Sequence, residues 1–305
     1  MNIHNKVAGQ IRPKVAILGA GTMGAGIAGV FAAQGYAVAV YSRTEATLSK
    51  ARDRIAAIAG EEVVVDYTTS LDDCVVGADI VCENLAEDIL LKQRVFAEIE
   101  VVAPHDCLLT TNTSSVPITQ IAAGLRQPER VAGIHWFNPP AVMPLVEIVR
   151  GERTSDETVQ RARLLCAEIG KEVIEVKTDI AGFVVNRLQY AILREALHLV
   201  ETGAASIEDV DRAVETTLAP RWSSAGPLRL MDLAGLDTVA KVSSILMPAL
   251  DRSRDVPSLV RSLCSEGAFG TKSGRGFYQW TDETIAAAIA QRDETVRLLT
   301  ERRNA

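Results

Sequence analysis

A glycine-rich turn constrains the fold of this chain more than any other feature. Residues 19–24 (GAGTMG) fit the pattern G-x-G-x-x-G, directly after the apolar run KVAIL and at the start of a helical stretch. In this pattern the first glycine permits a tight turn, the second lets a pyrophosphate approach the backbone, and the third lets the helix pack closely on the strand. Free N–H groups at the helix start would then face the phosphates. The turn predicts a dinucleotide site that includes Gly19, Gly21, Thr22, Met23 and Gly24.

The chain up to about Thr178 alternates short apolar runs with amphipathic stretches, which predicts a mostly parallel sheet covered by helices on both faces. With the glycine-rich turn, this is a Rossmann-type doubly wound α/β sheet. We expect strands at Val15–Leu18, Ala37–Tyr41, Val63–Val65, Ile80–Cys82, Cys107–Thr110, Val131–His135, Leu145–Val149 and Val173–Val176. Expected helices between them include Thr22–Gln34, Glu45–Ala59, Leu90–Glu100 and Asp156–Ile169.

The pattern changes after Thr178, where strand-like runs nearly disappear. Residues 180–202 predict one long helix, and Ser206 followed by Asp209 predicts a capped helix start. We therefore expect an all-helical C-terminal domain. The predicted divisions are a dinucleotide-binding domain at 14–178, a helical substrate and dimerisation domain at 179–280, and a helical tail at 281–305.

Composition excludes several classes of function. The net charge of −7 argues against a nucleic-acid or anionic-membrane surface. No apolar run reaches 18 residues, and Met1–Pro13 lacks the apolar core of a secretory signal. The five cysteines form no C-x-x-C pair and no metal-ligand spacing, which favours reduced, buried thiols and no metal site. We expect a cytoplasmic protein.

The end of the second predicted strand bears on the choice of cofactor. An acidic residue about 20 positions after the glycine-rich turn normally holds the adenosine ribose hydroxyls. This chain has Ser42 and Arg43 there, and a hydroxyl beside a guanidinium suits a 2′-phosphate. The sequence thus favours NADP(H), with NAD(H) as the alternative if Arg43 is only a solvated loop charge.

A histidine and a glutamate suggest the chemistry. His135 ends an apolar strand, where α/β enzymes keep their sites, and Glu147 interrupts another apolar run. A carboxylate is costly to bury unless it is paired, and a neighbouring histidine would be such a partner. Oxidation of an alcohol needs a base for the hydroxyl proton, and an oriented histidine fills that role near neutral pH.

These residues lie within a longer series of motifs. In chain order these are GAGTMGAGIAG at 19–29, NTSS at 112–115, HWFNPP at 135–140, GFVVNR at 182–187, GPLRLMDLAGLD at 226–237 and GTKSGRGFY at 270–278. The series resembles the 3-hydroxyacyl-CoA dehydrogenase family, including its short 3-hydroxybutyryl-CoA dehydrogenases. The resemblance extends from Lys14 to about Trp280.

The resemblance implies a role for each matching residue. His135 matches the general base, Glu147 the acid that orients it, and Ser114 and Asn186 the groups that bind the substrate oxygen. Glu87 and Lys92 match cofactor contacts on the nicotinamide side, and Asn112 is a further expected cofactor contact. Ser42 and Arg43, the expected contacts at the ribose, stand where the family has an acidic residue. Asn138 matches a substrate-side position of the HWFNPP loop, although a turn former is also expected before two prolines.

The implied activity is hydride transfer between a nicotinamide cofactor and the 3-carbon of a 3-hydroxyacyl or 3-oxoacyl group. Members that act on CoA thioesters resemble one another in a helical insertion after the second strand. Ser42–Ser70 has room for one helix and a short strand, so a ketoreductase for a carrier-bound, polyketide-type or free hydroxy acid is the alternative. The family also implies a homodimer formed through the C-terminal domain. A non-catalytic binding protein is the remaining reading, but it would not need to keep all four catalytic positions.

Overall fold

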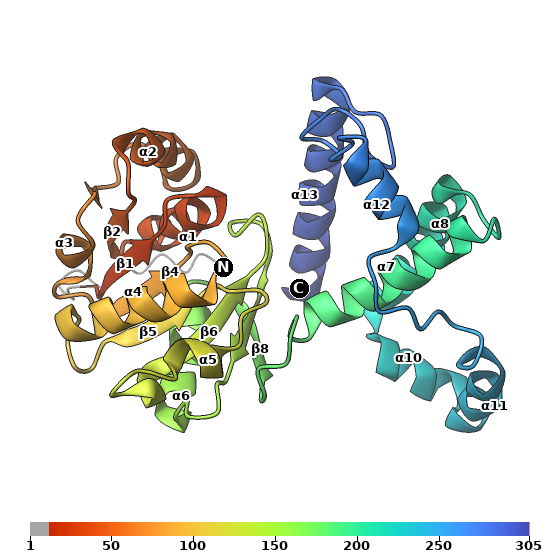
Figure 1. Ribbon diagram of the computed structural model, residues 1–305, viewed down its shortest axis with the longest axis horizontal. Coiled ribbons are helices and arrows are strands. Elements are labelled where there is room, and N and C mark those ends of the chain that lie inside the picture. Colours follow the sequence, from red (N-terminus) through yellow and green to blue (C-terminus); the bar gives the residue numbers. More distant parts are fainter. Residues whose placement is uncertain (1–11, 305) are drawn as a thin grey trace. The chain divides into compact units, whose positions relative to one another are not determined.

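The computed structural model describes residues 12–304, which fall into two compact units that divide between Asn186 and Arg187 (Figure 1). The division lies a few residues beyond the boundary expected near 178. The expectation that Met1–Pro13 lacks a secretory signal falls mostly on residues that lie outside the described range. None of the helices among residues 12–304 is long and apolar enough to cross a membrane.

The first unit is an eight-stranded sheet in the order β3-β2-β1-β4-β5-β6-β7-β8, flanked by helices. Its strands are β1 (Lys14–Leu18), β2 (Ala37–Tyr41), β3 (Val65–Thr68), β4 (Ile80–Glu83), β5 (Leu108–Thr111), β6 (Val131–Trp136), β7 (Leu145–Val149) and β8 (Glu172–Val176). Its helices are α1 (Thr22–Ala33), α2 (Glu45–Ala59), α3 (Leu71–Val75), α4 (Ile89–Val102), α5 (Ile118–Ala122), the 3-10 turn η1 (Pro128–Arg130) and α6 (Asp156–Glu168). The predicted doubly wound α/β class is confirmed.

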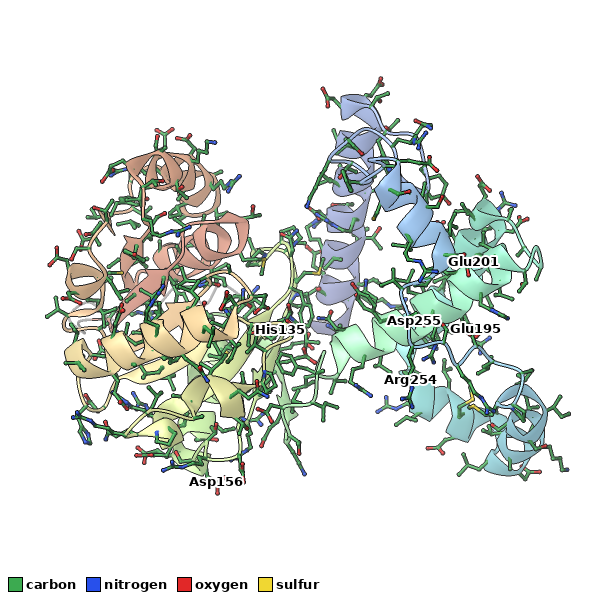
Figure 2. All side chains as sticks on the ribbon, viewed as in Figure 1. His135, Asp156, Glu195, Glu201, Arg254 and Asp255 are labelled. Carbon is green, nitrogen blue, oxygen red and sulfur yellow. The ribbon has the colours of Figure 1, made fainter. Side chains whose placement is uncertain are left out.

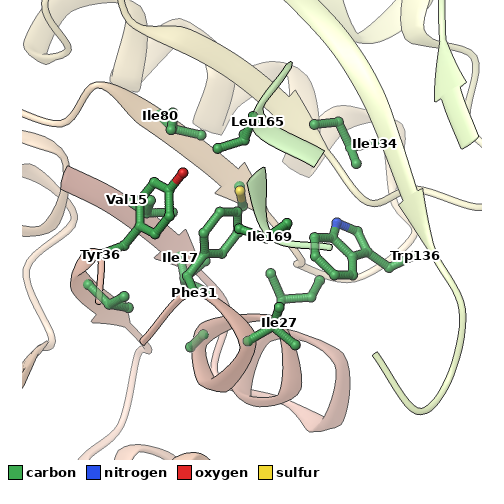
Figure 3. Packing of buried hydrophobic residues seen from close by; sticks show 14 of the residues in the cluster. Val15, Ile17, Ile27, Phe31, Tyr36, Ile80, Ile134, Trp136, Leu165 and Ile169 are labelled. Carbon is green, nitrogen blue, oxygen red and sulfur yellow. The ribbon is translucent and has the colours of Figure 1, made fainter. Parts of the chain in front are cut away.

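Alternate residues of each central strand enter cores on opposite faces of the sheet. In β1, Val15 and Ile17 pack with α1, α2 and α6, whereas Ala16 and Leu18 pack with α3, α4 and α5. Figure 3 shows the first of these cores, where the Phe31 ring of α1 stands edge-on to Trp136 at 6.1 Å between centroids. Both faces are covered, which explains why the strands have continuous apolar runs.

One expected strand is misplaced by the apolar pattern. The run Val63–Val65 predicted β3, but the strand begins at Val65 and continues to Thr68. Val64 is 86% exposed and lies in the irregular segment before the strand. β3 is an edge strand that pairs only with β2, so its position depends on register with Val38–Tyr41 and not on its own hydrophobicity.

The only antiparallel pairing among the eight strands joins β6 to β7. In this pairing His135 lies directly opposite Glu147. Directly opposed residues on neighbouring strands have their side chains on the same face and within contact distance. The reversal of chain direction therefore brings together two residues that are 12 positions apart.

The second unit is helical, as predicted. Its helices are α7 (Val185–Glu201), α8 (Ile207–Ala213), the short π-helix η2 (Val214–Leu218), α9 (Ala219–Ser224), α10 (Pro227–Ala234), α11 (Leu236–Leu246), α12 (Ser258–Ser265) and α13 (Asp282–Asn304). The Ser206 hydroxyl accepts from the Asp209 N–H, which confirms the predicted cap. The helix expected from Ile180 instead begins at Val185, because Gly182 and Phe183 adopt left-handed backbone angles that a right-handed helix cannot contain.

Four of the five cysteines are buried free thiols, as expected, but Cys264 of α12 is exposed. No cluster of metal-ligating side chains occurs among residues 12–304.

Candidate active site and cofactor site

The glycine-rich turn has the form that a pyrophosphate requires. Gly19 has φ +99°, and a Cβ added there would lie 2.7 Å from the Asn84 carbonyl oxygen. A Cβ on Gly24 would lie 1.8 Å from the Gly19 oxygen, so helix and turn can pack only on a glycine. A Cβ on Gly21 would meet nothing within 4 Å, and Gly21 caps α1 without any side-chain hydrogen bond. The turn therefore leaves open space beside uncapped helix N–H groups, which fits a bound phosphate.

Thr22 and Met23 form the first turn of α1, and Thr22 is exposed beside this open space. Ser42 follows the end of β2, where its N–H donates to the Thr68 carbonyl and extends the pairing with β3. Arg43 is exposed. Thr44 caps α2, so Arg43 lies in the short connection between β2 and α2.

His135 and Glu147 form the central pair of the candidate active site, at the end of β6 marked by His135 in Figure 2. Glu147 is fully buried and His135 is 5% exposed. The His135 Nδ1 atom lies 2.6 Å from Glu147 Oε2. Since a carboxylate oxygen accepts hydrogen bonds, Nδ1 is the ring nitrogen that donates to Glu147, and Nε2 is left for another partner.

The second oxygen of Glu147 binds backbone amides. Both the Val184 N–H and the Val185 N–H donate to Oε1 at 3.0 Å, at the start of α7. Helix N-termini stabilise negative charge, so these donors offset part of the cost of burying the carboxylate. Glu147 is therefore held at both oxygens.

Two phenylalanine rings pack edge-on against the imidazole of His135. The Phe137 ring centroid lies 4.7 Å from that of His135, and the Phe183 centroid lies at 5.4 Å. Neither ring offers a strong hydrogen-bond acceptor. The imidazole is thus confined without competition for its free nitrogen.

Ser114 and Glu87 are joined by two hydrogen bonds. Glu87 Oε1 accepts from the Ser114 N–H at 2.6 Å and lies 2.9 Å from the Ser114 hydroxyl, while Oε2 accepts from the Thr113 hydroxyl at 2.7 Å. Burial would raise the pKa of Glu87. The hydrogen bonds from Ser114 and Thr113, together with the Lys92 charge, instead hold this pKa below its ordinary value. Glu87 is therefore a carboxylate that fixes the turn after β5.

Lys92 lies deeper than an open cofactor contact would. Its side chain is 1% exposed, and its ammonium donates to both oxygens of Glu83 at 2.9 Å. The same nitrogen lies 3.6 Å from Glu87 Oε2. The Lys92 cation thus joins the fully buried Glu83 carboxylate to the carboxylate that holds Ser114. The predicted cofactor contact of Lys92 stays a prediction.

The three asparagines of the predicted site have different surroundings. Asn112 Oδ1 accepts from the Trp136 N–H at 2.8 Å, which ties the turn after β5 to the end of β6. Asn138 is exposed in the loop after β6, and Asn186 is half-buried next to Val185. The structure thus brings His135, Glu147 and the 112–114 turn to one edge of the sheet, and Asn186 follows the amides that bind Glu147.

Sequence reasoning missed three contributors to this edge, which are Glu83, Phe183 and Lys171. Glu83 ends the buried strand β4, and a carboxylate in that position was a visible signal. Lys171 donates to the carbonyls of Pro140 and Met143 at 2.6 and 2.7 Å and so anchors the loop after β6. Phe183 gave no signal, because its role depends on its backbone conformation.

Comparison with known proteins gives concordant matches over most of the chain. The family model of the 3-hydroxyacyl-CoA dehydrogenase NAD-binding domain matches residues 14–180, and the model of the 3-hydroxyacyl-CoA dehydrogenase C-terminal domain matches residues 182–280. The 5-formyl-3-hydroxy-2-methylpyridine 4-carboxylate 5-dehydrogenase of Mesorhizobium japonicum is 38% identical over 293 residues, which cover 91% of this chain and 94% of the relative.

Two solved structures are also similar. The crystal structure of a 5-formyl-3-hydroxy-2-methylpyridine 4-carboxylic acid 5-dehydrogenase, described as an NAD⁺-dependent dismutase, has a TM-score of 0.88 at 36% identity, covering 96% of this chain and 98% of its own. The (S)-3-hydroxybutyryl-CoA dehydrogenase of Ralstonia eutropha has a TM-score of 0.71 at 34% identity, covering 90% of this chain and 100% of its own.

Proposed function

This chain belongs to the 3-hydroxyacyl-CoA dehydrogenase family, and from that premise we propose which of its residues carry the reaction and which substrates it accepts. It is an oxidoreductase that acts on CH–OH groups and transfers a hydride between a nicotinamide cofactor and the 3-position of a 3-hydroxyacyl or 3-oxoacyl substrate. The observation that carries our assignment of the base is the buried His135–Glu147 pair at 2.6 Å.

In the oxidative direction His135 takes the hydroxyl proton of the substrate at Nε2. Glu147 keeps the other proton on Nδ1 and stabilises the imidazolium that results. The bound nicotinamide supplies the hydride acceptor. In the reductive direction the same Nε2 returns the proton to the alkoxide oxygen, by microscopic reversibility.

We assign Ser114 and Asn186 to the binding of the substrate oxygen. Ser114 lies in the turn that Glu87 holds, at the same edge of the sheet as His135. Asn186 directly follows the two amides that hold Glu147. For the cofactor, the 19–24 turn would hold the pyrophosphate, with Glu87, Lys92 and Asn112 on the nicotinamide side and Asn138 on the substrate side.

The assignment of the base is tested with His135→Gln. Loss of a general base costs on the order of 10² to 10⁴ in turnover, so kcat should fall by that range while cofactor binding is retained. His105→Gln is a matched control, because that histidine is exposed and hydrogen-bonds Gln127 away from the site. Near-wild-type kcat in a folded His135→Gln variant would disprove the assignment.

We further propose that the natural substrate is a compact acid or carrier-bound acyl group without a CoA nucleotide. Between Ser42 and Ser70 the chain has the single helix α2 and the short strand β3, where CoA-dependent members resemble one another in a helical insertion. The similarity to an enzyme named for a formyl pyridine carboxylate supports such a substrate. The alternative is a CoA thioester, as in the names of other relatives.

The proposal that the substrate has no CoA nucleotide is tested by comparing acetoacetyl-CoA with a short acetoacetyl thioester that lacks the nucleotide. Remote binding energy raises kcat/KM only where protein contacts exist to use it. We expect similar kcat/KM values for the two substrates. A preference for CoA of about 10³ or more would correspond to roughly 4 kcal/mol of nucleotide contacts and would contradict the proposal.

Two further proposals concern the choice of nicotinamide cofactor and the oligomeric state. We propose that Ser42 and Arg43 accommodate a 2′-phosphate, since Ser42 and not a carboxylate directly follows β2 and the Arg43 side chain is exposed. We also propose a homodimer formed through the helical unit. Its exposed apolar side chains include Leu228 at 84%, Leu233 at 76% and Ile245 at 73%, and large exposed apolar surfaces are typical of interaction sites.

A further inference from the structure

The segment 182–185, which we call the strap, lies near the end of the first unit, includes the first residue of α7 and contacts both members of the His135–Glu147 pair. We propose that Phe183 is a positioning residue for the base. Its left-handed backbone directs two successive amides onto Glu147, and its ring packs against the imidazole. This inference rests on the proposed role of His135.

The backbone of Phe183 is unusual for its residue type. Its φ is +48°, and it is the only non-glycine residue with positive φ among residues 12–304. Bulky side chains rarely adopt this conformation, and it persists only where the surroundings determine it. Here the Phe183 N–H donates to the Ile180 carbonyl at 3.0 Å, and the next two amides bind Glu147.

The two amides determine how the carboxylate of Glu147 is turned. Oε1 accepts from Val184 and Val185, so Oε2 alone remains for His135 Nδ1. Rotation of the carboxylate would break all three hydrogen bonds. The strap therefore fixes the direction of the Nδ1–H bond and, through the rigid imidazole ring, the direction of the Nε2 lone pair.

The ring of Phe183 contributes separately. It is 1% exposed and meets the imidazole at an interplanar angle of 65°. Phe137 packs on the imidazole in the same edge-on manner, at 66°, from a residue without left-handed backbone. Phe137 is therefore a natural control for the loss of a ring alone.

The test compares Phe183→Gly with Phe183→Ala. Both variants remove the ring, but only glycine adopts positive φ without a steric penalty. We expect Phe183→Ala to lose about 10- to 100-fold in kcat, the cost of displacing a catalytic group by about 1 Å, with the cofactor KM little changed. Phe183→Gly should lose clearly less, and Phe137→Leu should resemble Phe183→Gly.

A spectroscopic readout separates positioning from general instability. The short Nδ1–H···Oε2 bond should give a far-downfield proton resonance that is absent in His135→Gln. We expect this resonance to persist in Phe183→Gly and to shift upfield or broaden away in Phe183→Ala. If neither variant folds, Phe183→Asn and Phe183→Leu repeat the comparison, since asparagine tolerates the left-handed region.

Equal kcat values and equal resonances in the glycine and alanine variants would overturn the inference. If His135→Gln is inactive in that case, the base assignment stands and only the role of the strap fails. If His135→Gln keeps its activity, the proposed function itself fails, whatever the Phe183 variants show.

Discussion

The buried pair Glu83–Lys92 allows a sharp test of how this edge of the sheet is held together. Glu83 is completely buried and accepts four hydrogen bonds, two from the Lys92 ammonium and one each from the Leu85 N–H and the Thr111 hydroxyl. Glu83→Gln removes the negative charge and leaves the Lys92 cation in the protein interior. Lys92 would keep only the more distant, partly exposed Glu87 as an anionic neighbour, at 3.6 Å.

The magnitude follows from the cost of an uncompensated buried charge. Breaking a buried pair at one partner destabilises a protein by about 3–5 kcal/mol, whereas replacing both partners by neutral groups is often nearly neutral. For a unit of this size 1 kcal/mol shifts Tm by roughly 2–4 °C, so Glu83→Gln should lower the Tm of the first unit by about 6–20 °C. Glu83→Gln/Lys92→Met should recover most of that loss.

The assay is thermal unfolding followed by circular dichroism, with Glu175→Gln as the matched control. Glu175 pairs with Arg150 and Arg163 near the surface, and such pairs contribute about 0–1 kcal/mol. The reasoning is refuted if Glu83→Gln melts within about 2 °C of the wild type. It is equally refuted if the double variant is as unstable as the single one, because the cost would then not come from the orphaned charge.

Three further outcomes are expected. When the cofactor is varied, kcat/KM should be higher for NADP(H) than for NAD(H), and Arg43→Ala should reverse this preference. A clear preference of the wild type for NAD(H) would contradict the 2′-phosphate proposal. Light scattering at micromolar concentration should give the mass of a dimer, and Leu228→Glu/Leu233→Glu should shift it toward a monomer; a monomeric wild type would contradict the proposed interface. Burial lowers the pKa of Lys171 from 10.5 to about 8, so the unfolded chain binds more protons than the folded chain between these pH values. The contribution of Lys171 to the free energy of unfolding should therefore rise with pH from about 8 to 10.5. A difference in stability between wild type and Lys171→Met that does not change over this range would contradict this expectation.

The fold and the central pair could be predicted because their signals are local. The glycine-rich turn, the alternation of strand and helix, and the cap at Ser206 each depend on residues close together in the chain. Glu147 was recognisable because a carboxylate inside an apolar run needs a partner. The antiparallel pairing that sets it opposite His135 was not recognisable, since strand direction depends on how the chain returns through the 137–144 loop.

The two predicted boundaries that differ from the structure, those of β3 and α7, do so for different physical reasons. The apolar pattern places β3 too early, because the exposed segment before the strand also carries apolar residues and the register of an edge strand is set by its neighbour. The pattern also begins α7 too early, because the left-handed backbone at Gly182 and Phe183 does not alter the hydrophobic periodicity.

Glu83 shows that the argument used for Glu147 applies more widely. Both are carboxylates that end or interrupt buried strands, and both are completely buried. One is matched by a histidine across an antiparallel ladder, the other by a lysine from the helix that follows. An imidazole can donate a hydrogen bond at one nitrogen and accept a proton at the other, whereas an ammonium has only donors and can only hold the carboxylate in position. The type of partner, and not burial alone, therefore separates the acid–base pair of this site from the pair that supports it.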